Sequence, residues 1–201
     1  MGTDRILIVG VVWEKDTPSS TPLDITGCTY GGQALTQIAN VNVTNGSEPE
    51  VLVTVWYLLE AGIAAASNTA LTCTPDASED AQRPKIVFSG VYRNINQLAP
   101  VLNSQTASHA TDSTLSTSSL SSTSNPGVAI VIAGAGNNGS WASGSGWTEQ
   151  VDVSGDGSPD ARAFVGDRVT TGDTPAGSAT FTTVDSFGNR LGMIAIALNC
   201  R

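Results

Sequence analysis

The chain has 201 residues, a formal net charge of −9 at pH 7, and charged residues make up only 13% of it. Its few basic residues form no cluster and no apolar run is long enough to cross a bilayer, so we expect no nucleic-acid partner and no membrane insertion. At this length we expect a single domain over residues 1–201, since all-β domains commonly reach this size as one unit.

The first segments of the chain read as strands. Residues 5–14 form a near-continuous apolar run, and residues 25–30 form a short strand before Gly31-Gly32, which suits a tight hairpin. Residues 33–44 alternate between apolar and polar side chains. Their period slips once between Ile38 and Val41, which indicates a bulge.

Residues 51–59, Val-Leu-Val-Thr-Val-Trp-Tyr-Leu-Leu, predict the central strand of the fold. Branched and aromatic side chains favour a pleated surface over a helix. Thr54 is the only polar residue, so we expect both faces of this strand to be covered, as when two sheets pack face to face. Trp13 and Trp56 lie within such apolar runs and are interpreted as core residues.

The middle of the chain is weaker in pattern. Residues 60–68 have a helix-prone composition sufficient for one or two turns, and residues 70–74 and 85–92 read as strands. We expect residues 94–109 to form a long loop. The Ser/Thr-rich residues 111–124 are typical of a flexible linker, but Leu115 and Leu120 punctuate them and favour an exposed edge strand.

The last third completes an all-β pattern. Residues 127–135 are strongly apolar and predict a central strand, and the remaining strand candidates are residues 147–153, 161–169, 177–184 and 191–198. About eleven strand candidates with almost no helix predict a single antiparallel β-sandwich, or jelly roll.

Three cysteines, Cys28, Cys73 and Cys200, leave at least one thiol unpaired. The favoured interpretation is three buried thiols that act as small hydrophobes. The alternative is one disulfide and one free thiol. With a lone histidine and no Cys-x-x-Cys, the sequence offers no zinc set.

Four motifs carry a family resemblance. They are Thr-Asp-Arg-Ile-Leu-Ile-Val-Gly-Val at residues 3–11, Cys-Thr-Tyr-Gly-Gly-Gln-Ala-Leu-Thr at residues 28–36, Val-Trp-Tyr-Leu-Leu at residues 55–59 and Val-Phe-Ser-Gly-Val at residues 87–91. In this order they resemble the concanavalin A-like, laminin-G-like jelly-roll domains of bacterial and phage surface or virion proteins. The resemblance implies a sandwich fold and a modular surface, virion or adhesive role.

The start of the chain departs from that family. Similar domains have an extended segment before the Arg-Ile-Leu-Ile strand, whereas here the chain begins almost at it, with no basic region and no cleavable signal peptide. A missing first strand would leave an unpaired edge beside a hydrophobic core. Our hypothesis is that a neighbouring subunit covers this edge.

The segment around residues 152–160 has the spacing of a calcium loop. Oxygen-bearing side chains fall at positions one, three, five and nine, with Gly157 at position six. These candidate ligands are Asp152, Ser154, Asp156 and Asp160. Position twelve is Ala163 in place of a bidentate glutamate, so an ordinary Asp/Gly turn is the favoured interpretation and calcium the alternative.

Trp141 and Trp147 flank a Gly/Ser loop. We expect both to be exposed, either as aromatics that stack on a carbohydrate or as anchors of a subunit interface.

No catalytic residues and no cofactor are predicted. His109 has Asp112 three residues on, but no Gly-x-Ser-x-Gly elbow accompanies them, so a solvated histidine is favoured over a triad. None of the predicted strands carries paired carboxylates for glycoside hydrolysis. Residues 134–139 match Gly-x-Gly-x-x-Gly, but the Gly/Ser-rich stretch that follows does not predict the helix that a dinucleotide needs.

We therefore predict a non-enzymatic structural subunit of a virion or extracellular assembly. Such a subunit would be a phage head-decoration, tail or fibre component, or a filament subunit, and would act by packing against copies of itself or other subunits. The alternative is a carbohydrate-binding module, with calcium as an aid. A surface rich in Ser, Thr, Gly and Asn and poor in ions is typical of secreted proteins and virion shells.

Overall fold

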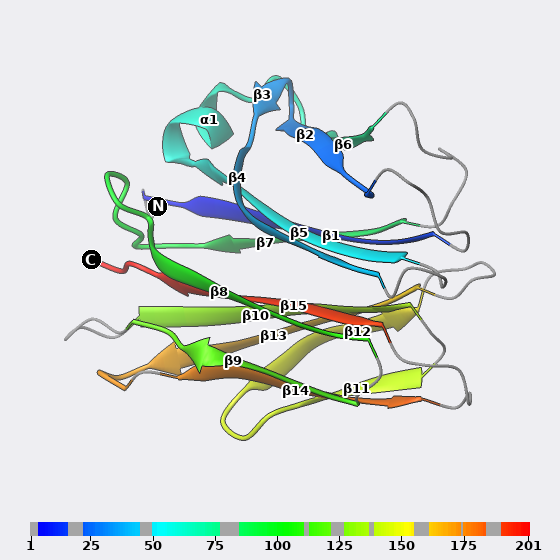
Figure 1. Cartoon of the computed structure of the whole chain (residues 1–201). Coiled ribbons are helices and arrows are strands. Elements are labelled where there is room, and N and C mark those ends of the chain that lie inside the picture. The colour runs from blue at the N-terminus through cyan, green and yellow to red at the C-terminus, as the bar shows by residue number, and fades with distance from the viewer. Residues whose placement is uncertain are drawn as a thin grey trace.

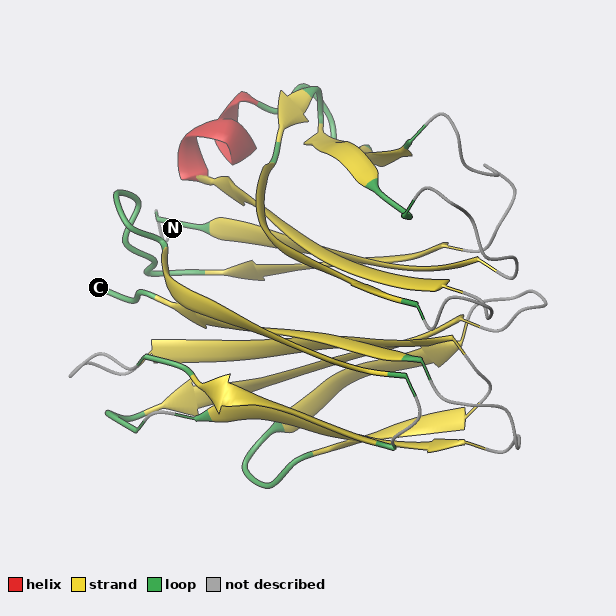
Figure 2. Ribbon diagram, in the orientation of Figure 1, coloured by secondary structure: helices red, strands yellow, loops and turns green. Residues whose placement is uncertain are grey.

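The computed structural model describes residues 4–15, 22–44, 50–76, 85–110, 113–121, 127–136, 139–154, 161–173, 175–183 and 190–201. In this part of the chain the fold is all-β and antiparallel, with one short helix (Figure 2). The predicted sandwich class is confirmed, and the jelly-roll connectivity stays a prediction. No helix in these ranges is long and apolar enough to span a bilayer.

The described residues form fifteen strands and one helix. They are β1 (Ile6–Lys15), β2 (Ile25–Tyr30), β3 (Gln33–Ala34), β4 (Thr36–Val43), β5 (Glu50–Leu59), α1 (Glu60–Ala65), β6 (Leu71–Pro75), β7 (Lys85–Tyr92), β8 (Val101–His109), β9 (Thr114–Ser119), β10 (Gly127–Gly136), β11 (Gly139–Ser143), β12 (Thr148–Ser154), β13 (Ala161–Thr170), β14 (Ala176–Thr183) and β15 (Leu191–Leu198).

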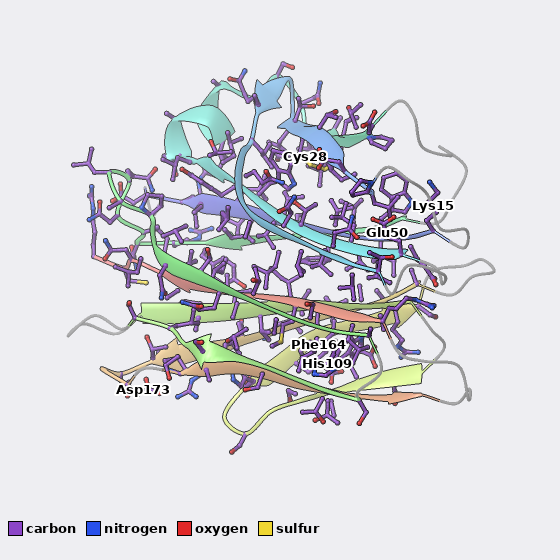
Figure 3. All side chains as sticks on the ribbon, viewed as in Figure 1. Lys15, Cys28, Glu50, His109, Phe164 and Asp173 are labelled. Carbon is purple, nitrogen blue, oxygen red and sulfur yellow. A yellow bond between two sulfur atoms is a disulfide. The ribbon has the colours of Figure 1, made fainter. Side chains whose placement is uncertain are left out.

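Four sheets stack as layers (Figure 1). Sheet I has the strand order β4-β5-β1-β7 and faces sheet II, β12-β13-β10-β15-β8. Sheet III, β11-β14-β9, covers the outer face of sheet II, and sheet IV, β3-β2-β6, covers that of sheet I together with α1. Side chains fill the spaces between the layers (Figure 3).

Three hydrophobic clusters correspond to the three interfaces between layers. The central cluster joins sheets I and II, a second lies between sheets II and III, and a third lies between sheets I and IV. Strands β1, β5, β10 and β15 are therefore covered on both faces, and every residue of β15 is buried. This double cover explains why these strands read as continuous apolar runs, and it confirms the expectation for residues 51–59.

Glycines let sheets I and II approach closely. A Cβ at Gly134 would lie 2.6 Å from Cγ1 of Val12 and 2.8 Å from Cγ2 of Val53, closer than real Cβ contacts. Because branched valines in a packed core have no room to move aside, a side chain at this position would push the sheets apart.

Three local predictions have mixed outcomes. The bulge of β4 is confirmed, although its register against β5 shifts between Gln37 and Ala39, slightly before the predicted slip. Residues 114–119 form the edge strand β9 of sheet III, as favoured over a linker. The predicted loop at residues 94–109 is wrong, because residues 101–109 form β8 along β15. Its polar sequence suits a sheet edge, where Leu102 and Ala107 pack against the cluster between sheets II and III and Val101 packs against the central cluster.

The preference for three free thiols is also wrong. Cys28 and Cys73 are directly opposite on β2 and β6, with Cα atoms 4.1 Å apart, and form a disulfide in the uppermost layer (Figure 3). Cys200 is the free cysteine of the described residues and is half-buried. Burial raises the pKa of its thiol.

Arg5 holds the start of α1 to the start of β1. Its backbone N–H and its Nε donate to Oε2 of Glu60, at 2.9 and 2.8 Å, and its terminal nitrogen donates to Oε1 at 2.6 Å. These hydrogen bonds lower the pKa of Glu60 to about 2.

The lowered pKa gives a pH-dependence with a definite sign. Stabilisation by Glu60 is present above the carboxyl pKa of the unfolded chain, about 4.3, and is lost as the pH falls through the folded value of about 2. We therefore expect native protein to be more stable than Glu60→Gln at pH 7, by a small amount since the pair is partly exposed. Urea unfolding should show this difference shrinking towards pH 2. A difference that stays constant from pH 7 to pH 2 would contradict the assignment.

Candidate functional site

The side of the molecule where β7 and β12 end their sheets carries a groove. Across the central interface β4 faces β8, β5 faces β10 and β15, β1 faces β10 and β13, and β7 faces β13. Sheet I has four strands and sheet II has five, so β12 has no counterpart in the described part of sheet I. The resulting groove, of about 350 Å³, opens between the outer edge of β7 and the strands β12 and β13.

The groove has an apolar and a polar part. The apolar part is lined by Ile8, Phe88, Ile130, Val151 and Val165, and the polar part includes Tyr92, Gln150 and Asp167. The Tyr92 hydroxyl lies 3.5 Å from Oδ2 of Asp167, and Nε2 of Gln150 donates to Oδ1 at 2.9 Å. Burial, reinforced by the Asp167 carboxylate, raises the pKa of Tyr92, so its hydroxyl stays protonated and donates to that carboxylate.

Exposed apolar side chains gather around this groove. Of the five large hydrophobic residues exposed in the described chain, four lie on β7, β12 and β13. They are Val87 (44% exposed), Val91 (54%), Val153 (39%) and Val169 (68%). In the described residues no strand pairs with the outer side of β7, so an open strand edge and an apolar surface coincide here.

A buried ion pair lies inside the sandwich. Oε1 of Glu14 is 3.6 Å from a terminal nitrogen of Arg190, which also donates to the carbonyl oxygen of Gly136 at 2.7 Å. Glu50, at the same end of sheet I, accepts a hydrogen bond from the backbone N–H of Leu23 at 2.8 Å. Glu14 therefore faces sheet II while Glu50 faces sheet IV, so the two buried carboxylates are not placed as an acid/base pair.

The expectation that Trp141 and Trp147 are exposed is wrong. They are 4% and 7% exposed and belong to the cluster between sheets II and III. The Trp141 ring lies 6.0 Å from that of Phe164, and the Arg168 guanidinium lies 6.0 Å from the Trp147 ring. Trp141 lies on β11, which packs in the extra layer, and Trp147 directly precedes β12, so the Gly/Ser stretch between them brings both rings into this cluster. Whether either residue contacts a ligand or another subunit stays a prediction.

The proposed calcium ligands fall partly within the described chain. Both carboxylate oxygens of Asp152 accept hydrogen bonds from Arg162, at 2.7 and 2.9 Å, and Ser154 is exposed at the end of β12. Asp156 and Asp160 lie outside the described residues. Among the residues described, no group of three or more His, Cys, Asp or Glu side chains is placed to hold a metal ion. The calcium loop stays a prediction.

Two further motifs can be placed. His109 is exposed at the end of β8, as expected of a solvated histidine, and Asp112 lies outside the described residues. Gly134 and Gly136 lie in β10, and the strand β11 begins at Gly139. A strand therefore stands where a dinucleotide site needs a helix N-terminus.

Comparison with known proteins adds no homologue. No protein-family model matches the chain, and neither the curated proteins nor the solved structures yield a significant match. The resemblance to concanavalin A-like domains therefore stays a prediction from the motifs. The sequence did not single out the groove residues Tyr92, Gln150 and Asp167.

Proposed function

We propose that this chain is a non-enzymatic structural subunit of a virion or extracellular assembly, which packs against copies of itself or other subunits. The observation that supports this most is the groove beside β7. An unpaired strand edge is a template for pairing with another chain, and exposed valines next to it are removed from water when another surface covers them.

The layered architecture adds support. Sheets III and IV cover the outer faces of the central sandwich, and hydrophobic side chains fill the spaces between the layers. Exposed apolar side chains concentrate at one side of the molecule, around the groove. Head-decoration, tail, fibre and filament subunits all suit such a side-to-side contact. The family resemblance and the low-charge surface rich in Ser and Thr favour these classes.

Carbohydrate binding is the second candidate. It gains one observation from the groove, where the aromatic ring of Tyr92 lies beside the carboxylate of Asp167 and the amide of Gln150. Such groups can bind sugar hydroxyls. The buried Trp141 and Trp147 lend it no stacking surface.

Assembly can be tested directly with the full chain. We expect mass photometry and sedimentation velocity between nanomolar and high micromolar concentrations to show concentration-dependent association, and electron microscopy to show a regular particle. A chain that is monomeric at every concentration would contradict the proposal. Glycan-array binding by such a monomer would favour the carbohydrate-binding alternative instead.

A further inference from the structure

We propose that the groove is one half of a two-fold joint between two copies of this chain, in which β12 of each copy enters the groove of the other and pairs with its β7. This inference rests on the proposed structural role and names the partner as a second copy.

The shape of the edge is complementary to itself. A strand added beside β7 in the plane of sheet I would lie over the inner face of β12, where Val151 is half-buried and Val153 is 39% exposed. The incoming strand must come from an edge that projects by one strand, and β12 itself projects in this way. A two-fold axis parallel to the strands places sheet II of one copy in the same layer as sheet I of the other. Each β12 then lies beside the β7 of the other copy. Such an interface is isologous and closed.

The strand directions fit this pairing. Ile8 and Ile130 meet in the groove, and Gly134 lies against Val12, so β1 and β10 run the same way. β12 and β10 are both antiparallel to β13, so β12 runs in the direction of β10 and therefore of β1. Because β7 is antiparallel to β1, β12 is antiparallel to β7. Rotation about an axis along the strands preserves this direction. The new pair would be antiparallel, like every other pair in the described sheets.

The charges at one end of the joint are also complementary. Arg93 follows the last residue of β7 and is exposed, and Glu149 is the second residue of β12 and is exposed. Both lie at the same end of the groove, because the hydroxyl of Tyr92 reaches Asp167, whose partner across β12 and β13 is Thr148. The joint therefore brings Arg93 of each copy level with Glu149 of the other, an attraction that favours this pairing over β7 against β7.

The joint also accounts for three of the four exposed valines, Val153, Val87 and Val91. Val153 would face the inner surface of the other copy's β12 across the two-fold axis, about 10 Å away between strand backbones. Val87 and Val91 lie on the outer face of β7, since the alternate residues Phe88 and Tyr92 pack against the central cluster. There they would lie beside the other copy's β11, which packs next to β12.

Val153→Arg tests the joint in the full chain. Two guanidinium groups would then oppose each other at the two-fold axis, so we expect the dissociation constant of the dimer to rise about tenfold or more. The matched control is Leu98→Arg, because Leu98 is 95% exposed on the loop after β7 and does not line the groove. It should leave the constant unchanged. Circular dichroism melting should show both variants folded, since neither replaced side chain is buried.

Charge reversal provides a second, independent readout. Arg93→Glu and Glu149→Arg should each weaken association several-fold, and the double variant should recover most of the loss. If the native chain associates but Val153→Arg does not weaken it and the double reversal does not rescue, the joint is wrong while the structural role stands. If the native chain never associates, both are wrong.

Discussion

Replacing Arg190 with methionine is expected to lower the free energy of unfolding by about 3–5 kcal/mol. Glu14 is 1% exposed and Arg190 is 5% exposed, and the pair lies between the two central sheets. The guanidinium also donates to the carbonyl oxygen of Gly136, the last residue of β10. Its removal takes away the guanidinium that lies 3.6 Å from the buried Glu14 carboxylate. Guanidinium chloride unfolding, followed by circular dichroism, measures the loss.

The double variant Glu14→Met/Arg190→Met is the control for this prediction. Removing both charges and keeping similar side-chain volumes replaces the pair by apolar contacts, which is often neutral or stabilising. We expect its unfolding free energy to lie close to that of the native protein, and well above that of Arg190→Met alone. Equal losses in the single and double variants would mean that packing by Arg190, and not the charge left on Glu14, determines the effect.

The same ion pair shows where sequence patterns stop being informative. Glu14 follows an apolar run and precedes Lys15, a position typical of a strand leaving the core for solvent. It is buried because β15 and the end of β10 lie across the central interface from it. Arg190 lies 176 residues beyond Glu14 in the chain, and no local sequence pattern indicates this contact.

Elements that are covered on both faces could be predicted, because burial on two sides leaves a continuous apolar run in β1, β5, β10 and β15. Strands at sheet edges could be predicted less well. β8 reads Val-Leu-Asn-Ser-Gln-Thr-Ala-Ser-His and shows little apolar alternation, since its backbone pairing with β15 does not depend on side-chain hydrophobicity. β11 is short and rich in Gly and Ser, which favours a loop on composition alone.

The groove could not be predicted for a different reason. Its lining comes from β1, β7, β10, β12 and β13, and its existence depends on the sideways offset of sheet I against sheet II. Strand predictions fix neither the order of strands in a sheet nor that offset. For the same reason the strand predictions did not indicate sheets III and IV. Trp141 and Trp147 were expected to be exposed because the layer that buries them, sheet III, was not predicted.

The disulfide is expected to have an effect of similar size. Cys28→Ala/Cys73→Ala should lower the free energy of unfolding by about 4 kcal/mol, because the bond closes a loop of 45 residues and restricts the unfolded chain. Reduction of the native protein with dithiothreitol should lower its free energy of unfolding by a comparable amount, which is measured as a lower denaturation midpoint. The double variant should not respond to dithiothreitol, which serves as the control for effects of the reductant elsewhere.

Sheet IV also determines what the unfolding transition should look like. It is the smallest cover of the central sandwich, and Trp13 and Trp56 are buried beneath it, at 1% and 6% exposure. Without the disulfide, β2 and β6 keep their backbone pairing, a hydrogen bond of 3.2 Å from the Thr26 hydroxyl to the carbonyl oxygen of Thr74, and the cluster under them. If this layer separates before the sandwich unfolds, tryptophan emission should shift to the red at lower denaturant than the loss of β-sheet signal. Coincident transitions in the reduced protein would show instead that the four layers unfold as one unit.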